Sequence, residues 1–281
     1  MSSNERVMYH GTVRSLPLAE QLRAAALAGC SSLTTGPREY LNWLMNGIST
    51  RDIRAMAADM DVRYDHLDPF VRWMPNWQPA DPNIPLSALN YDEDDFFRMA
   101  EALEAVSFSV VAACPQGANS MNELIDSFGR LCQRSARYGL RCDLEFVAFF
   151  GGVPDLASAW QIVTAVNADN SGILFDFWHY NRGQADDALL KTIPGRWITG
   201  VQLSDATAQL PSGMTELEDT IFHRRVPGQG EFRVREIVAI LREIGGLNNV
   251  GPEIFSAAFD ELDAETIAAQ CRDGVEWALA T

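Results

Sequence analysis

Four polar residues lie at or near the ends of four apolar segments in the second half of the chain. Glu145 lies in CDLEF, Asp176 in ILFDF, Gln202 in GVQLSD and Glu253 in GPEIF. Their apolar neighbours predict that each polar side chain points into one shared space while the neighbours pack in the core. Carboxylates gathered in this way repel one another, and burying an unpaired ion costs several kcal/mol. The arrangement therefore calls for protonation or for a cation.

A divalent metal ion would satisfy all of these carboxylates at once, and Gln202 would add a neutral carbonyl oxygen. An all-oxygen set of ligands suits Mg²⁺ or Mn²⁺ better than Zn²⁺. The alternative is a structural network in which Arg224 and Arg225 neutralise the carboxylates. We therefore expect one divalent metal ion, Mn²⁺ or Mg²⁺, with the arginine network as the competing interpretation.

His179 follows Asp176 by three residues in GILFDFWHYN, residues 172–181. A simpler interpretation makes Asp176 a helix N-cap and His179 an ordinary loop residue. All four histidines, however, are expected at or just after strand ends: His10, His66, His179 and His223. A lone histidine is more often structural than catalytic, but four at one rim indicate a functional site.

Short apolar segments alternate with amphipathic helical stretches along the chain. Strands are expected at 7–13, 30–35, 62–67, 108–113, 141–146, 172–176, 198–203 and 249–254. Helical periodicity is clearest at 18–29, 121–139, 234–246 and 263–280. Eight such units of roughly 30–35 residues predict a single (β/α)8 TIM barrel over residues 1–281. A doubly wound sheet is the main rival, but YHGTVRSLPL after the first strand lacks a glycine-rich phosphate loop.

Composition limits the partners. The chain of 281 residues carries a net charge of −16, which argues against nucleic acid or an anionic membrane as a partner. No apolar segment approaches the roughly 20 residues of a membrane helix, and the polar N-terminus does not resemble a signal peptide, so we expect a cytoplasmic protein.

Lys191 is the only lysine, which leaves little scope for a Schiff base. The five cysteines are expected to be free, buried thiols: Cys30, Cys114, Cys132, Cys142 and Cys271.

The pattern resembles the xylose isomerase-like TIM barrels, a superfamily of sugar isomerases, epimerases and AP-endonuclease-type proteins. The resemblance is specific from about residue 141 onward, and HRRVPGQGEF (223–232) is similar to the family's Arg-x-x-Pro-Gly-x-Gly segment. It implies one divalent metal ion held by the four polar residues named first, namely Glu145, Asp176, Gln202 and Glu253. It also implies that Arg224 contacts substrate oxygens and that His179 lies beside the metal ligands or the substrate. Barrels of this kind are often dimers or tetramers, so a homo-oligomer is left open.

The chemistry implied is proton transfer next to a carbonyl group of a sugar or keto-polyol. The metal ion would polarise the carbonyl, and Glu145 and Glu253 would serve as an acid–base pair on opposite faces. Isomerisation or epimerisation is the expected reaction, with His179 as a further catalytic residue. Epimerases of this group usually have His where Gln202 stands. The alternative is therefore dehydration of a keto-polyol or keto-glycoside, resembling 3-dehydroshikimate and 2-keto-inositol dehydratases.

Several side chains are expected around the substrate: His10, His66, Trp73, Trp178 and Arg224. In a dehydration, His10, His66 or His179 would protonate the leaving hydroxyl. Segment 67–85 carries Phe70, Trp73 and Trp77 among prolines, and is interpreted either as a lid or as a satellite cluster or oligomer contact. A lid would favour a substrate with an apolar part, and the lack of a phosphate-binding glycine cluster beyond PGQG favours an unphosphorylated one. A non-catalytic sugar-binding protein is the remaining alternative class.

Overall fold

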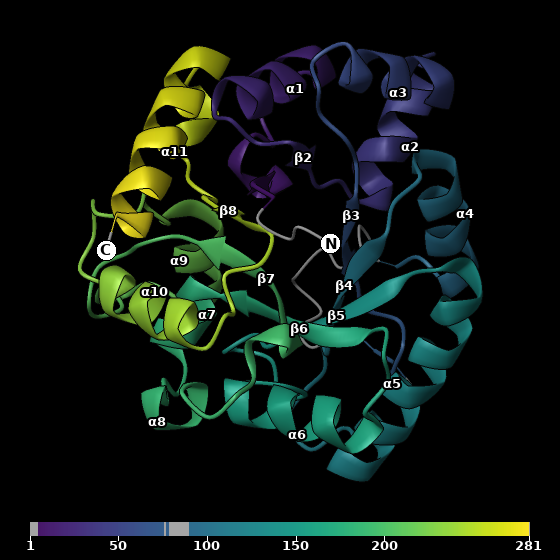
Figure 1. The fold of residues 1–281 in the computed structure, drawn as a ribbon, viewed down its shortest axis with the longest axis vertical. Helices are drawn as coiled ribbons and strands as arrows, with labels where there is room; N and C mark the ends of the chain where they lie inside the picture. The colour runs from purple at the N-terminus through teal and green to yellow at the C-terminus, as the bar shows by residue number, and fades with distance from the viewer. Residues whose placement is uncertain (1–4, 76, 79–89, 281) are drawn as a thin grey trace.

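A ring of helices surrounds a closed set of short parallel strands in the computed structural model, which describes residues 5–75, 77–78 and 90–280 (Figure 1). The strands are β1 (Val7–Met8), β2 (Ser32–Leu33), β3 (His66–Phe70), β4 (Ser107–Val111), β5 (Arg141–Glu145), β6 (Ser171–Asp176), β7 (Ile198–Leu203) and β8 (Val250–Pro252). The helices are α1 (Leu18–Leu27), α2 (Pro37–Met45), α3 (Thr50–Ala58), α4 (Glu93–Leu103), α5 (Met121–Ser135), α6 (Leu156–Val166), α7 (Phe177–Arg182), α8 (Asp187–Leu190), α9 (Glu216–Phe222), α10 (Val234–Glu243) and α11 (Ala264–Leu279).

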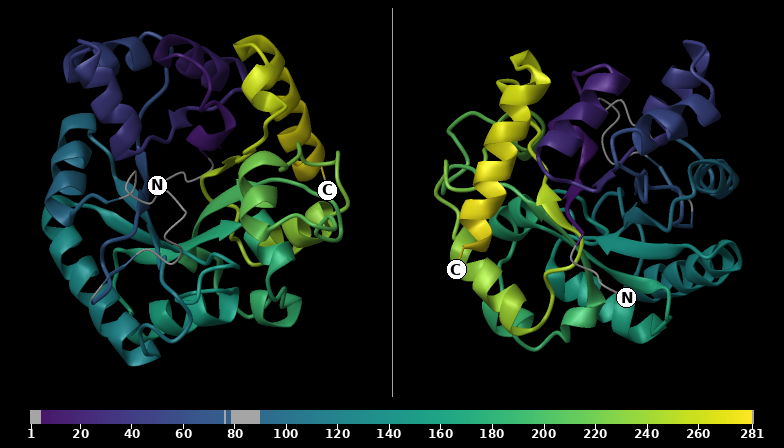
Figure 2. Two further views of the ribbon diagram at one scale, coloured as in Figure 1. Left: turned by 180° about the vertical axis from the view of Figure 1, so that it is seen from behind. Right: turned by 45° about the horizontal axis from the view of Figure 1, so that its top comes forward.

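The barrel closes through two parallel groups of strands. Strands β3 to β8 form one sheet in sequence order, and β1 pairs with β2. Single bridges complete the ring, from Arg6 to Val250 on one side and from Ser32 to Arg63 and Thr35 to Leu67 on the other. Figure 2 shows the outer ring closing where α11 packs beside α1. The (β/α)8 barrel expected from the sequence is therefore confirmed.

Buried parallel strands are continuous apolar segments because helices cover one face and the barrel interior fills the other. All six residues of β6 are buried, as are all five of β4. Most strands lie where the sequence predicted them. The third strand does not, because it begins at His66 instead of ending at residue 67. The Arg63 guanidinium binds the carboxylates of Asp65 and Glu5, and this ion-paired stretch lies outside the strand.

The helices bury one apolar face each and are capped by polar side chains. In α5, Leu124, Phe128 and Leu131 are buried, and the Ser120 and Glu123 side chains form a capping box at its start. The five cysteines are free and buried, as predicted. Among the described residues, no helix is long and apolar enough to cross a membrane.

Candidate metal centre and active site

The structure brings Glu145, Asp176, Gln202 and Glu253, here called the polar ring, to one end of the barrel. Glu145 ends β5 and Asp176 ends β6, and in the sheet register Asp176 lies beside Gln202 of β7. Glu253 follows β8 directly, and its backbone N–H donates to the carbonyl of Leu203 in β7. These side chains occupy the carboxyl ends of neighbouring strands, where TIM barrels carry their active sites. All four are buried, with no more than 6% of any residue exposed.

Arg224 lies within the polar ring. Its Nη1 donates to Asp176 Oδ2 at 2.7 Å and to Glu253 Oε2 at 2.8 Å. The guanidinium therefore links the ends of β6 and β8, as the arginine-network interpretation anticipated. Arg225 does not join it, since its Nη1 donates to the Gln229 carbonyl instead.

The donor chemistry of the polar ring still fits a divalent cation. Gln202 Nε2 donates to Glu253 Oε1 at 2.7 Å, while Gln202 Oε1 is buried and accepts no hydrogen bond from the described residues. A buried acceptor without a donor is costly in a protein interior and is the kind of atom that binds a cation. When all three are ionised, the carboxylates of Glu145, Asp176 and Glu253 outnumber the Arg224 charge by two, which a divalent ion would balance.

His179 joins this group through the start of α7. Asp176 is indeed an N-cap, because its Oδ1 accepts from the His179 backbone N–H at 2.7 Å, and its Oδ2 faces Arg224. Ala148 N–H donates to His179 Nδ1 at 3.4 Å, which assigns the ring proton to Nε2, 3.8 Å from Glu145 Oε1. Glu145, Asp176 and His179 each offer a ligand atom within 4.8 Å of the others. Asp176 is therefore the N-cap that the simpler interpretation predicted, but His179 lies in helix α7 and not in a loop.

Burial and neighbouring charges set the ionisation of the site. Burial, reinforced by Asp68 and Asp176, raises the pKa of Glu145 well above its ordinary value. Burial also raises the pKa of Glu253, against the opposing effect of Arg224. Burial disfavours the charge on Asp176 as well, but Arg224 and His179 outweigh it and hold the pKa of Asp176 below its ordinary value. Burial lowers the pKa of His179 to about 4, so this imidazole is neutral at pH 7.

Asp68 is a site residue that the sequence reasoning missed. It lies in β3, is buried, and accepts a short hydrogen bond from Ser109 Oγ. His10 Nδ1 lies 3.9 Å from Asp68 Oδ2 and is itself buried without a hydrogen-bond partner among the described residues. The available signal was a polar residue in HLDPF, one position beyond the strand expected at 62–67.

Two of the expected substrate contacts, His66 and Trp73, lie away from the polar ring, whereas Trp178 is buried beside it. His66 pairs in register with Ser107, the first residue of β4, and its Nδ1 bonds the Ser107 hydroxyl. It therefore lies at the end of the barrel opposite Glu145, because β3 starts where the prediction ended it. Trp73 is buried, with its Nε1 donating to the Val111 carbonyl. Trp178 is fully buried, and its Nε1 donates to Asp219 Oδ2. Trp73 therefore packs in the core, against Phe128, while the Trp178 ring lies beside His179 and Arg224.

The expected lid, 67–85, is only partly described, and residues 76 and 79–85 lie outside the described part of the chain. Phe70 is fully buried and packs against Phe96 and Phe108. Trp77 is partly buried and packs on the hydrophobic core. Phe70 and Trp73 thus belong to the main core and not to a satellite cluster, and Trp77 packs against both that core and a smaller cluster around Val71.

The PGQG segment is organised by Asp205, another residue that the sequence reasoning passed over. Asp205 Oδ2 accepts from the backbone N–H groups of Gly228 and Gly230, and its Oδ1 accepts from those of Ala206 and Phe232. A Cβ added at Gly230 would lie 2.3 Å from Asp205 Oδ1, so this close approach requires glycine. The amide groups that could cradle a phosphate are already bound by a carboxylate.

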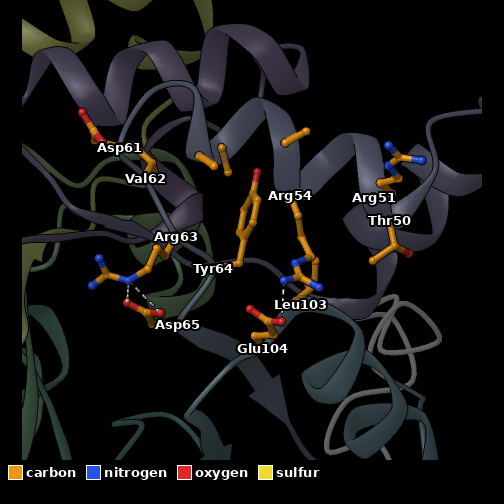
Figure 3. Close-up of a pocket in the computed structure, with 13 residues that line it drawn as sticks. Thr50, Arg51, Arg54, Asp61, Val62, Arg63, Tyr64, Asp65, Leu103 and Glu104 are labelled. Atoms are coloured by element: carbon orange, nitrogen blue, oxygen red, sulfur yellow. Dashed lines mark hydrogen bonds and ion pairs between the residues drawn. The ribbon is translucent and has the colours of Figure 1, made fainter.

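Two cavities lie at opposite ends of the barrel. One of about 630 Å³ is lined by residues that include Gln116, Phe149 and Gln184, and no residue of the polar ring lines it. The Phe149 ring is centred 5.7 Å from the His179 ring. The other, of about 850 Å³, lies between α3, residues 61–65 and the end of α4 (Figure 3), and no residue of the polar ring lines it.

Known proteins match this chain over much of its length. The 3-dehydroshikimate dehydratase of Pseudomonas aeruginosa is 26% identical over 246 residues, covering 86% of this chain and 37% of that protein. The inosose isomerase of Bacillus subtilis is 30% identical over 142 residues, covering 50% of this chain and 49% of that protein. The chain thus spans well under two thirds of the dehydratase's length.

Solved structures share the fold. The IOLI protein with a bound zinc atom matches with a TM-score of 0.83 at 19% identity, covering 98% of both chains. A fusion of a xylose isomerase-like TIM barrel with a 4-hydroxyphenylpyruvate dioxygenase matches with a TM-score of 0.80 at 24% identity, covering 98% of this chain and 42% of that one. The family model described as "Xylose isomerase-like TIM barrel" matches residues 22–280. The chain therefore belongs to the xylose isomerase-like TIM barrel family.

Proposed function

We propose that this chain is a divalent-metal-dependent enzyme that removes the proton next to the carbonyl of a keto-polyol or keto-cyclitol and then expels a neighbouring hydroxyl as water. One asymmetry carries the proposal. Glu145 accepts no hydrogen bond from the described residues, whereas Asp176 and Glu253 are both held by Arg224. Glu145 is therefore the carboxylate with an oxygen free to take a proton, whereas Asp176 and Glu253 are held in place by Arg224.

The proposed metal site consists of Glu145, Asp176, Gln202 and Glu253. A divalent cation bound there would act as a Lewis acid toward the substrate carbonyl. The ligands are oxygen atoms, which suits Mn²⁺ or Mg²⁺. The buried, unpartnered Gln202 Oε1 and the surplus of negative charge support a cation at this place.

The proton transfer can be written with Glu145 as the single base. Its carboxylate takes the proton from the carbon next to the carbonyl, and the C–H electron pair passes into the carbonyl to form an enolate. The His179 Nε2–H faces Glu145 and can donate a hydrogen bond to a substrate oxygen bound between them. Glu145 then returns its proton to the leaving hydroxyl as the C–O bond breaks, and water departs. The residue regains its starting state.

The relatives support dehydration over the isomerisation expected first from the sequence. The dehydratase match extends over 86% of the chain, and the isomerase matches over 46% to 64% of it. Epimerisation would need a second base, and the candidate, Glu253, accepts hydrogen bonds at both oxygens. Isomerisation remains the second candidate because inosose isomerases are among the relatives. It shares the first step and differs in the second: Glu145 returns the proton to the former carbonyl carbon, and the proton of the neighbouring hydroxyl passes to the former carbonyl oxygen, so that the carbonyl moves by one carbon.

The substrate class follows from the surroundings of the site. The PGQG amide groups are bound by Asp205, which supports an unphosphorylated substrate. The 630 Å³ cavity beside Phe149 supplies room for a ring or a neutral substituent.

The deciding experiment incubates the Mn²⁺-loaded protein with 3-dehydroshikimate and with an inosose in deuterated water. Dehydration is expected to give a product lighter by one water, with ultraviolet absorption from the new conjugation. Deuterium incorporation without loss of mass would instead identify an isomerase. Glu145→Gln should abolish both signals. A metal-loaded wild-type protein that exchanges no proton and loses no water on either compound would refute the proposal for these substrates and leave sugar binding as the favoured role.

A further inference from the structure

Arg224 is enclosed by the protein on every side. Only 3% of the residue is exposed, and its guanidinium carbon lies 5.6 Å from the Trp178 ring centre and 5.2 Å from that of Phe255. Its Nε and Nη2 both donate to the Thr220 hydroxyl, at 3.2 Å and 2.8 Å. Every guanidinium nitrogen is thus engaged by the protein, with Nη1 shared between Asp176 and Glu253.

This geometry differs from that of an arginine poised to bind substrate. Both hydrogens of Nη1 are directed at the polar ring, and the two aromatic rings leave the guanidinium little freedom to turn. Two carboxylates buried side by side would repel each other without this charge, and burial strengthens the repulsion because the surroundings screen it weakly. The positive charge of Arg224 therefore reduces the repulsion between Asp176 and Glu253 even in the metal-free protein.

We propose that Arg224 is the built-in counter-ion of the polar ring: it holds Asp176 and Glu253 in place in the metal-free protein and opposes the metal ion that binds there. The inference rests on the metal site of the proposed function. It makes Arg224 a positioning residue that acts through two metal ligands. It also implies that Arg224 lowers the affinity for the metal ion while it keeps the metal ligands in position in the metal-free protein.

Arg182 supplies a matched control. It is also buried, lies 5.8 Å from the same Trp178 ring, and forms an ion pair at 2.8 Å with Asp219. It makes no contact with the polar ring. Replacing Arg182 by Met therefore removes a buried arginine and its ion pair beside the same tryptophan, and leaves every metal ligand with its partners.

The test compares wild type, Arg224→Met and Arg182→Met after chelator dialysis. Thermal unfolding is followed over a range of Mn²⁺ concentrations, and Mn²⁺ affinity is measured by calorimetry. Without metal, Arg224→Met should unfold at a lower temperature than Arg182→Met. Saturating Mn²⁺ should raise its unfolding temperature more than that of wild type, and it should bind Mn²⁺ roughly tenfold more tightly, because a like charge close to the ion is gone. Arg182→Met should show the wild-type Mn²⁺ shift and affinity.

The outcomes separate this inference from the proposed function. An Arg224→Met protein with unchanged or weaker Mn²⁺ affinity would overturn the counter-ion role. If Arg224→Met binds Mn²⁺ but wild type and Arg182→Met do not, the counter-ion role of Arg224 is supported. The same result would contradict a metal-dependent function of the natural chain. If Arg224→Met can be purified only with Mn²⁺, chelator is added while circular dichroism is followed. Unfolding of this variant but not of Arg182→Met supports the inference, and equal behaviour of the two overturns it.

Discussion

His179 Nε2 lies 3.8 Å from Glu145 Oε1, and both side chains are buried at the carboxyl end of the barrel. This relationship depends on the cap of α7. Asp176 accepts the backbone N–H of His179, so the first turn of the helix fixes the position of the imidazole relative to β5. One carboxylate thus starts the helix, contributes to the polar ring and positions the histidine.

Asp176→Asn is expected to lose metal. After dialysis against Mn²⁺, wild type should retain about one ion per chain by mass spectrometry, and the variant clearly less, because a charged ligand becomes a neutral amide. Asp143→Asn is the control. Asp143 is also a buried acid, but it binds Arg141 and Thr199 inside the barrel, so this variant should retain wild-type metal. Equal, near-zero metal in all three proteins would favour the arginine network over the metal site.

Glu145→Gln and Glu253→Gln should have different effects. Glu145→Gln removes the proposed base, and kcat should fall roughly 10²–10⁴-fold while the unfolding temperature stays near that of wild type. Glu253→Gln takes a charged partner from Arg224, so the metal-free protein should unfold at a lower temperature. Steady-state kinetics and thermal unfolding measure the two effects. Equal losses of kcat without a difference in stability would contradict the single-base mechanism.

Much of this fold and site could be predicted from sequence because buried parallel strands are unbroken apolar segments. Strands β5, β6 and β7 lie within one residue of their predicted places. The side chain of a polar residue at the end of such a segment is expected to point into the open end of the barrel. That single argument identified all four residues of the polar ring.

What could not be predicted depends on contacts between distant segments. Arg63 and Asp65 form an ion pair before β3, and the strand starts at His66. His66 therefore lies at the end of the barrel opposite the one predicted, and Asp68, which was expected just beyond the strand, lies within it. The sequence offered Arg224 both as a substrate contact and as a network residue. Its hydrogen bonds to Asp176, Glu253 and Thr220 are the observation from which the counter-ion role is proposed.

The buried thiols should resist alkylation in the folded protein. Burial raises the pKa of Cys30 to about 12, so almost none of it is thiolate at pH 8, and only thiolate reacts readily. Native protein treated with iodoacetamide at pH 8 should leave Cys30 and Cys271 unmodified by peptide mass spectrometry. Protein unfolded in urea should be modified at both. Rapid native labelling of Cys30 would show that α1 or α11 opens locally.

Asp205→Asn should destabilise the protein by about 3–6 kcal/mol, because hydrogen bonds to a charged acceptor contribute roughly 1.5–3 kcal/mol each and the amide nitrogen cannot accept one. The carboxylate accepts four backbone N–H groups, so two of them would lose their acceptor. Urea unfolding measures the change. Asp260→Asn is the control, since its ion pair with Arg14 is partly exposed and should contribute under about 1 kcal/mol. Equal, small losses in both variants would mean that solvent replaces the Asp205 contacts, and the PGQG amide groups would then be available to bind a phosphate group.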